Sequence, residues 1–327
     1  MRVPGLTRDL SRRRPRTLRL GLRAALAALL LALPAAAPAA SLPEGVKRIT
    51  LSVDGLPRKA LIEAPAEDES GDGPHPTLVL LHDMQQSALQ VRALAALSRA
   101  EPLRDWLRVY PEGAGRTWNA GRRRVDGGEA IRMPDVAFLR ALVASLAEQG
   151  LADPSRIVLV GFGEGGAMVL RMLCEAPGLA MGAAVVGASW PASLHCGLGR
   201  PTPVLVFNGT EDPAVPYVGG QARPDRKVGA GALASVDRTL SSLVALNDCR
   251  APRDETLEGG LGRRRIWFAC QAPILQWRIE RMGHRWPGSP EPARTGDGLG
   301  PPAPEGAPDA TLLIAGFFVS LAERPGP

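Results

Sequence analysis

The sequence contains few cysteines and few aromatic residues: four cysteines in 327 residues, and 4% phenylalanine, tryptophan and tyrosine. No two cysteines have the Cys-x-x-Cys spacing of a zinc site, so we expect no metal centre. The chain also lacks a hydrophobic run long enough to cross a membrane. The strongest candidate, residues 20–33, is shorter than the roughly 20 apolar residues that a spanning helix needs. The sequence therefore predicts neither a zinc site nor a helix that spans a membrane.

The first forty residues have the composition of a secretory signal peptide. The apolar run 20–33 follows a basic segment and precedes a small-residue stretch in which Ala37-Pro38-Ala39 is a plausible cleavage site. No cysteine adjoins this site, so a lipoprotein anchor is not expected. We interpret residues 1–40 as a leader that exports the protein to the periplasm or the medium. The basic segment contains Arg2, Arg8, Arg12, Arg13, Arg14, Arg16, Arg19 and Arg23.

The positive charge of the chain comes from this leader. The whole sequence is formally +6, and the leader's eight arginines and single aspartate contribute +7, which leaves about −1 for residues 41–327. Two arginine clusters remain, Arg122–Arg124 and Arg263–Arg265, and no aromatic residues are interleaved with them. Such clusters are typical of solvated loops or hairpin faces. We therefore expect no nucleic-acid partner.

The even number of cysteines predicts disulfides, because disulfides are the usual state of cysteine in exported proteins. Four cysteines allow three pairings. Proximity in the sequence favours one of them, Cys174 with Cys196 and Cys249 with Cys270.

Strand-like and helix-like segments alternate along residues 41–327. This order predicts a single α/β domain with a mainly parallel sheet and helices on both faces. Residues 287–308 are rich in proline and glycine, which indicates a surface loop before the last helix. The expected strands are 48–53, 60–64, 77–82, 107–110, 156–160, 183–187, 204–208 and 274–279. The expected helices are 88–99, 136–149, 167–174, 232–246 and 310–321.

Residues 156–168 have the pattern of a strand, a glycine-rich turn and the start of a helix. In serine hydrolases of the α/β class this arrangement carries Gly-x-Ser-x-Gly, with the nucleophilic serine on the turn. Here the frame is Gly161-Phe162-Gly163-Glu164-Gly165, so Gly163 stands at the nucleophile position. The same glycines fit the dinucleotide fingerprint Gly-x-Gly-x-x-Gly. That interpretation requires an acid at the end of the next strand, where the sequence has Gly187-Ala188-Ser189-Trp190 instead.

Two further residues have the order of a catalytic triad. Asp212 follows the strand 204–208, and His284 follows the strand 274–279. Elbow, acid and histidine come in this order in α/β-hydrolases. In that role Asp212 orients His284 and stabilises its protonated form. The alternative is that both are ordinary turn residues, but their joint occurrence after strands favours the remnant of a triad.

The chain resembles the secreted polyhydroxybutyrate depolymerase and feruloyl-esterase-like branch of the α/β-hydrolases. The resemblance implies the α/β-hydrolase fold, carboxylic-ester substrates, no cofactor and the same disulfide pairing. The segments that carry it run in family order over nearly all of the mature chain: Leu80-Leu81-His82 with Gln86-Ser87, Tyr110-Pro111-Glu112-Gly113, Trp118-Asn119-Ala120-Gly121, Asp135-Val136-Ala137-Phe138-Leu139, the glycine-rich turn, Gly209 to Tyr217, Ala245-Leu246-Asn247-Asp248-Cys249 and Gly283 to Gly288.

Two departures from the family pattern fall on the chemistry. Gly163 replaces the serine, and Asp83 replaces the glycine of a His-Gly pair. The loop at Asp83 and Met84, together with Glu164, is where the backbone N–H groups of an oxyanion hole are expected. A carboxylate there opposes an oxyanion. Serine at 163 is expected to recover part of the ester turnover, and additional glycine at 83 to recover more.

Two functions follow. The first is a pseudo-hydrolase that binds an ester or related ligand in a pocket formed by Trp118, Asn119 and Trp286 beside His284. The second is an active ester hydrolase with an unconventional nucleophile or a water activated by His284 and Asp212.

Overall fold

The computed structural model describes residues 41–65, 73–121, 133–196, 199–221, 231–292 and 296–323. Residues from Pro43 onward form one unit. The leader 1–40 and the arginine cluster at 122–124 lie outside the described residues. The interpretation of residues 1–40 as a signal peptide and of 41–327 as one domain therefore stays a prediction.

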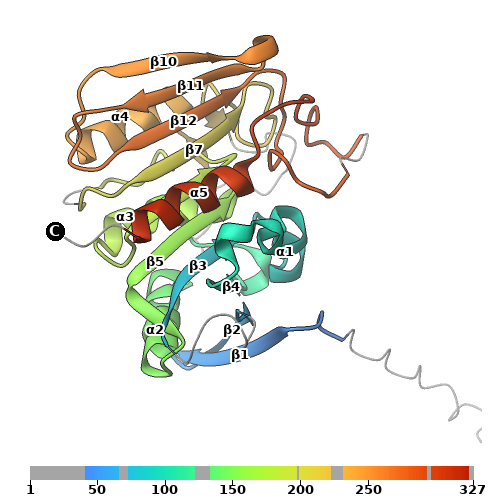
Figure 1. The fold of residues 1–327 in the computed structure, drawn as a ribbon, viewed down its shortest axis with the longest axis vertical. Coiled ribbons are helices and arrows are strands. Elements are labelled where there is room, and N and C mark those ends of the chain that lie inside the picture. Colours follow the sequence, from blue (N-terminus) through green and yellow to red (C-terminus); the bar gives the residue numbers. More distant parts are fainter. Residues whose placement is uncertain are drawn as a thin grey trace, which may run out of the picture. The chain divides into compact units, whose positions relative to one another are not determined.

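The centre of the fold is a ten-stranded sheet (Figure 1). Its order is β1-β2-β4-β3-β5-β6-β7-β12-β11-β10, in which the run from β4 to β12 is parallel and both edges are antiparallel. The strands are Val46–Val53 (β1), Leu56–Glu63 (β2), His75–Leu81 (β3), Leu107–Pro111 (β4), Ala152–Phe162 (β5), Gly182–Val186 (β6), Val204–Gly209 (β7), Pro252–Leu257 (β10), Gly262–Trp267 (β11) and Ile274–Ile279 (β12), with a small separate pair Gly220–Gln221 (β8) and Ala232–Leu233 (β9).

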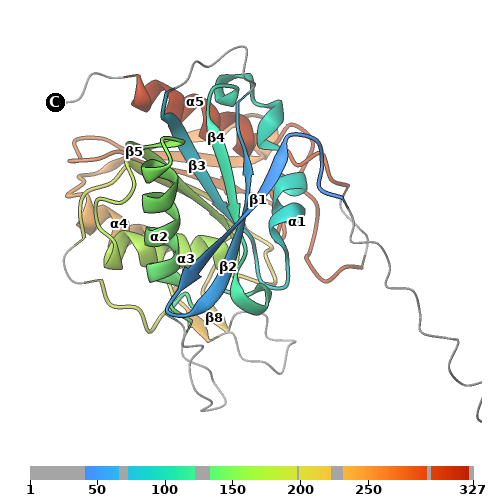
Figure 2. The same ribbon diagram turned by 90° about the horizontal axis from the view of Figure 1, so that it is seen from below.

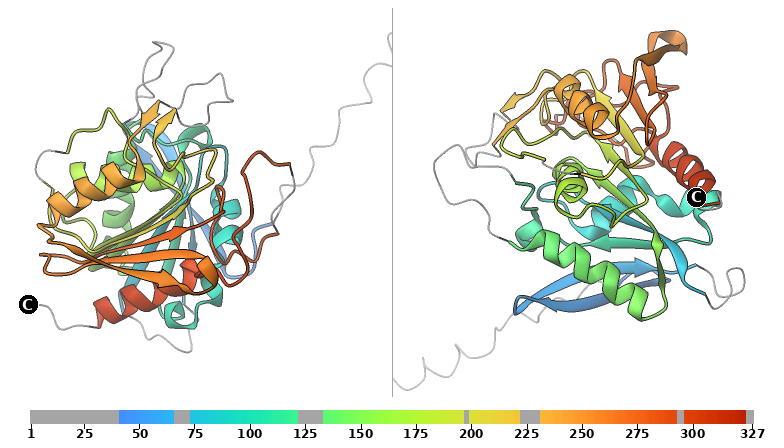
Figure 3. Two further views of the ribbon diagram at one scale, coloured as in Figure 1. Left: turned by 90° about the horizontal axis from the view of Figure 1, so that it is seen from above. Right: turned by 90° about the vertical axis from the view of Figure 1, so that its left-hand side faces the viewer.

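Helices cover both faces of the sheet. In Figures 2 and 3, α1 and α5 lie on one face and α2, α3 and α4 on the other. The helices are Ala88–Ala95 (α1), Asp135–Glu148 (α2), Glu164–Glu175 (α3), Val236–Leu246 (α4) and Ala310–Ala322 (α5), with short 3-10 helices at Leu97–Arg99, Glu101–Leu103, Ala114–Arg116 and Glu258–Gly260. The predicted fold class is confirmed: a mainly parallel sheet with helices on both faces.

The central strands are apolar because both of their faces are buried. All residues of β6 and β7 are buried, as are the last five of β3. A parallel sheet covered on both sides requires such continuous apolar runs. The carboxyl ends of these strands meet at one edge, so the loops after them share one region.

Two predicted helices differ from the observed ones by four residues at one end. The helix expected at 88–99 ends at Ala95, because Ala96 takes a left-handed conformation with φ 44°. The helix expected at 232–246 begins at Val236, because the Ser235 side chain accepts the backbone N–H of Arg238 and caps it. The hairpin of β10 and β11 was not among the expected strands. Its polar side chains give no apolar alternation; Arg265 of β11, for example, binds Asp254 of β10.

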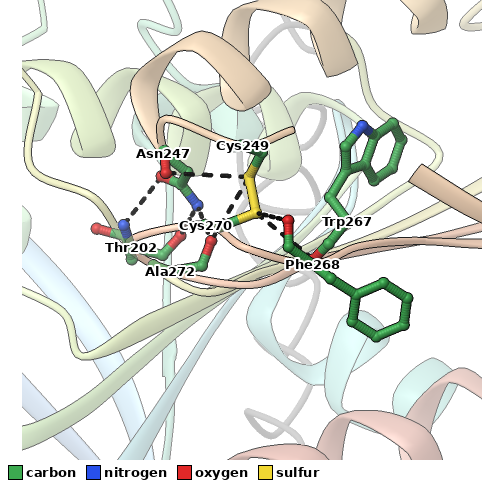
Figure 4. Close-up of a disulfide and its surroundings, with 7 residues drawn as sticks. All are labelled: Thr202, Asn247, Cys249, Trp267, Phe268, Cys270 and Ala272. Carbon is green, nitrogen blue, oxygen red and sulfur yellow. Dashed lines mark hydrogen bonds between the residues drawn. A yellow bond between two sulfur atoms is a disulfide. The ribbon is translucent and has the colours of Figure 1, made fainter. Parts of the chain in front are cut away.

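Both disulfides have the predicted pairing, Cys174–Cys196 and Cys249–Cys270, so all four cysteines are bonded. Figure 4 shows Asn247 beside the second one, where its amide donates to the carbonyls of Thr202 and Ala272. The two disulfides indicate an oxidising compartment. No described helix is both long and apolar enough to span a membrane.

We expect loss of the Cys249–Cys270 disulfide to lower the free energy of unfolding by about 3 kcal/mol, because the bond closes a loop of 21 residues in the unfolded chain. The double variant Cys249→Ser with Cys270→Ser should show this in urea unfolding. Non-reducing peptide mapping of the wild type that finds Cys249 free or joined to another cysteine would contradict the pairing.

Candidate active site

The turn between β5 and α3 has the backbone of a nucleophile elbow. Gly163 lies between Phe162, the last residue of β5, and Glu164, the first residue of α3, with φ 53° and ψ −117°. A side chain is strained in this conformation by about 1–3 kcal/mol, whereas glycine adopts it freely. The turn is also tight: a Cβ at Gly161 or Gly165 would overlap neighbouring backbone. The fold therefore has the elbow backbone with glycine at the nucleophile position.

Asp212 and His284 are brought together by neighbouring strands. β7 precedes Asp212, β12 precedes His284, and the two strands pair in parallel. Asp212 Oδ2 lies 2.7 Å from His284 Nδ1. Its Oδ1 accepts the backbone N–H groups of Ala214 and Val215, which fixes the carboxylate. The His284 ring is buried and stacks on Phe162 with 4.7 Å between ring centroids.

The Asp83 carboxylate lies on the other side of the imidazole. Asp83 follows β3 and His82, and its Oδ2 is 3.2 Å from His284 Nε2. Its Oδ1 accepts the backbone N–H of Glu164 at 2.8 Å. A Cβ built on Gly163 would overlap this carboxylate. Asp83 therefore occupies the volume in which a side chain at position 163 would begin, and it binds one of the two expected oxyanion donors.

The His284 imidazole lies between two carboxylates. Its burial lowers its pKa, but the charge and hydrogen bond of Asp212, and then those of Asp83, outweigh this and raise the pKa to about 9. At neutral pH the ring is protonated, so it cannot accept a proton as a general base. The amino end of α3 also stabilises the Asp83 carboxylate, because the amino end of a helix favours a negative charge.

This ion pair predicts a pH-dependent stability. The folded pKa of His284 is raised from 6.5 to about 9, so its contribution to stability is complete below pH 6.5 and is lost as pH rises through 9. The contribution is on the order of 3 kcal/mol. We expect the free energy of unfolding to fall between pH 7 and pH 9.5, and to fall less in Asp83→Asn. An equal decline in both proteins would contradict the role of Asp83.

The other predicted site residues lie apart from the imidazole. The Glu164 carboxylate accepts the Thr117 hydroxyl and the Trp118 backbone N–H. The Trp118 ring is buried, and its Nε1 donates to the His82 carbonyl. The Asn119 backbone N–H donates to Asp135.

Met84 packs against Val215 and Leu233. No group of three His, Cys, Asp or Glu side chains in the described part of the chain is placed to hold a metal.

A pocket of about 420 Å³ opens beside His284. Residues within 288–292 and 299–307 of the proline-rich segment line it, and the described part of this segment runs beside α1 in Figures 1 and 2. The His284 backbone N–H donates to the Leu299 carbonyl, so this hydrogen bond joins the proline-rich segment to the loop that carries His284. Trp118 and Asn119 do not line this pocket. The lining of the pocket includes Gln86, Leu94, Phe162, His284, Trp286 and Ala307.

The sequence did not predict Phe162, Gln86 or Leu94 as site residues. Phe162 has a recognisable signal, because it directly precedes the nucleophile position on the elbow. Leu94 has none: it is one apolar residue of α1, and it belongs to the site only because residues distant in the sequence, such as Pro304 and Ala307, line the same pocket.

Comparisons with known proteins agree with this fold. A family profile described as phospholipase/carboxylesterase matches residues 128–226, which include the elbow and Asp212 but neither Asp83 nor His284. The protein "Putative esterase NocK" of Nocardia uniformis subsp. tsuyamanensis is 27% identical over 265 residues, 75% of this chain and 73% of that protein.

Two further proteins extend the comparison. "Feruloyl esterase B" of Piromyces equi is 28% identical over 192 residues, 53% of this chain but only 33% of that longer protein. The solved acetyl xylan esterase from Aspergillus awamori superposes with a TM-score of 0.51 at 13% identity, over 73% of this chain and 94% of that one. The chain is thus an α/β-hydrolase in fold and is similar to esterases in sequence.

Proposed function

We propose that the protein is an exported, esterase-like α/β-hydrolase that binds an ester or related ligand beside His284 and does not perform serine-type ester hydrolysis. The observation that carries this proposal is the Asp83 carboxylate in the volume of the serine side chain, bound to the N–H of Glu164 and next to Nε2 of His284. Acyl transfer requires both a nucleophile and donors for the oxyanion. Here the serine nucleophile is absent, and one of the expected oxyanion donors, the N–H of Glu164, is already bound by Asp83.

The pocket supports retained binding. Its volume is within the range of small-molecule sites, and Leu94, Phe162 and Trp286 supply an apolar lining. The resemblance to polyhydroxybutyrate depolymerases and feruloyl esterases favours a carboxylic ester or a related acid as the ligand. Direct activation of water by His284 is the weaker candidate, because its raised pKa and its contact with Asp83 leave no free basic nitrogen at neutral pH.

The proposal is tested with purified protein lacking residues 1–40. We expect no labelling by a fluorophosphonate, no hydrolysis of 4-nitrophenyl butyrate above the buffer rate, and saturable binding of ethyl ferulate by calorimetry. Ala307→Trp should abolish binding by filling the pocket. Val218→Trp, at a position that is 85% exposed, should not. Stoichiometric fluorophosphonate labelling of the wild type, or absence of ligand binding, would disprove the proposal.

A further inference from the structure

The two oxygens of Asp83 have different surroundings. Oδ1 accepts the N–H of Glu164 at the start of α3, and Oδ2 faces Nε2 of His284. The carboxylate overlaps the volume of a Cβ at Gly163, so it lies where an elbow nucleophile begins. Carboxylates act as covalent nucleophiles in several enzyme classes. The elbow thus has a carboxylate from the loop after β3 at the place where a side chain at position 163 would begin.

We propose that Asp83 is a nucleophile towards a saturated carbon that bears a stable anionic leaving group, such as the carbon of an alkyl halide or alkyl sulfonate. This inference rests on the proposed ligand pocket and not on any residual serine chemistry. An acyl substrate would develop an oxyanion and need the Glu164 N–H, which Asp83 Oδ1 binds. Displacement at an alkyl carbon develops charge on the leaving group instead, so the occupied donor is no obstacle.

The first step forms an ester between Asp83 and the alkyl group. Oδ2 donates an electron pair to the carbon, the bond from carbon to the leaving group breaks, and the leaving group departs as an anion with that pair. Asp83 is then neutral. One of the two carboxylates that raise the pKa of His284 is gone, and the ring releases its Nε2 proton to solvent.

The second step hydrolyses this ester. Water attacks Cγ of Asp83 while His284, oriented by Asp212, takes a proton from it. The negative charge develops on Oδ1, which the Glu164 N–H already binds. The intermediate expels the alkoxide, which His284 protonates, and the carboxylic acid of Asp83 returns its proton to the ring. The sum is alkyl halide and water giving alcohol, halide ion and one proton.

The pocket suits an alkyl group. Gln86 and His284 both line it, and both contact Asp83: the Gln86 side chain accepts the Asp83 backbone N–H, and His284 lies at Oδ2. The apolar side chains of Leu94, Phe162 and Trp286 form the adjoining part of the lining. A linear carbon chain buried there gains free energy in proportion to the apolar area removed from water.

The test uses 1-bromohexane with the protein lacking residues 1–40, with bromide release as the rate measurement. A single turnover in ¹⁸O-water should place one heavy oxygen on Asp83, located by peptide mass mapping, and yield unlabelled hexanol. Asp83→Asn should reduce bromide release to the buffer rate. His284→Gln should release one bromide per protein and retain a hexyl group on Asp83. Asp237→Asn, an exposed aspartate on α4, should keep the wild-type rate.

Absence of heavy oxygen on Asp83, or bromide release unchanged in Asp83→Asn, would overturn the assignment. The isotope measurement uses the wild type, so it decides the question even where Asp83→Asn does not fold. Ethyl ferulate binding separates the two proposals. Binding without bromide release rejects Asp83 as a nucleophile and leaves the proposed function standing, whereas loss of binding rejects the proposed function.

Discussion

Gly163→Ser together with Asp83→Gly is expected to restore fluorophosphonate labelling and to raise 4-nitrophenyl butyrate hydrolysis by at least about 10²-fold over the wild type, the lower range of general-base catalysis. Glycine at 83 removes the carboxylate that overlaps the side chain at 163, and it frees the Glu164 N–H and Nε2 of His284. With Asp83 gone, the hydrogen bond and charge through which it raises the pKa of His284 are removed, so the pKa falls towards the range in which the ring can act as a base.

Gly163→Ser alone should neither label nor gain activity, and it should be less stable than the wild type. Its Cβ meets the Asp83 carboxylate, and a side chain at φ 53° is strained. This differs from the sequence-based expectation of partial recovery. The matched control is Gly163→Ser with Asp83→Asn, which keeps the bulk at 83 and should stay inert. Circular dichroism checks that Gly163→Ser with Asp83→Gly is folded. If this folded variant shows no more labelling or hydrolysis than the control, Asp212 and His284 lack triad geometry.

Asp135→Ala is expected to lower the free energy of unfolding by about 3–5 kcal/mol, because it leaves a buried guanidinium without its partner. Arg58 on β2 binds Asp135, the first residue of α2, at 2.6 Å, with side chains only 2% and 0% exposed. Asp135 Oδ2 also accepts the Asn119 backbone N–H, so the variant loosens the loop that Glu164 binds through Trp118. Urea unfolding measures the change.

A surface ion pair provides the control for this prediction. Asp153 binds Arg156 near the start of β5, with side chains 21% and 38% exposed, and Asp153→Ala should cost less than about 1 kcal/mol. Replacing both buried partners, as Arg58→Met with Asp135→Asn, should recover most of the loss, because no unpaired charge remains and the amide oxygen can still accept from Asn119. Equal losses in Asp135→Ala and Asp153→Ala would contradict the importance of the buried pair.

The sequence by itself determined most of the elements and their order. Short β-branched runs, helical periodicity and capping residues act over a few neighbours, so the elbow at Gly163 and the strands before Asp212 and His284 could be located without coordinates. It also determined the disulfide pairing, since proximity along the chain favoured Cys174 with Cys196 and Cys249 with Cys270. The polar hairpin β10–β11 escaped because its arginines pair with acids across the strands, and such pairs leave no apolar signal.

Only the tertiary structure decided where the Asp83 carboxylate points. The sequence placed it near the oxyanion donors, but its contact with His284 joins residues 201 positions apart. That contact exists because β3 pairs with β5, so that the loop after β3 meets the elbow at the carboxyl edge of the sheet. The same distinction separates Trp118 from Trp286: local sequence marks both as aromatic loop residues. Packing buries the first against His82 and brings the second to the pocket, because side-chain surroundings depend on which distant segments the sheet brings together.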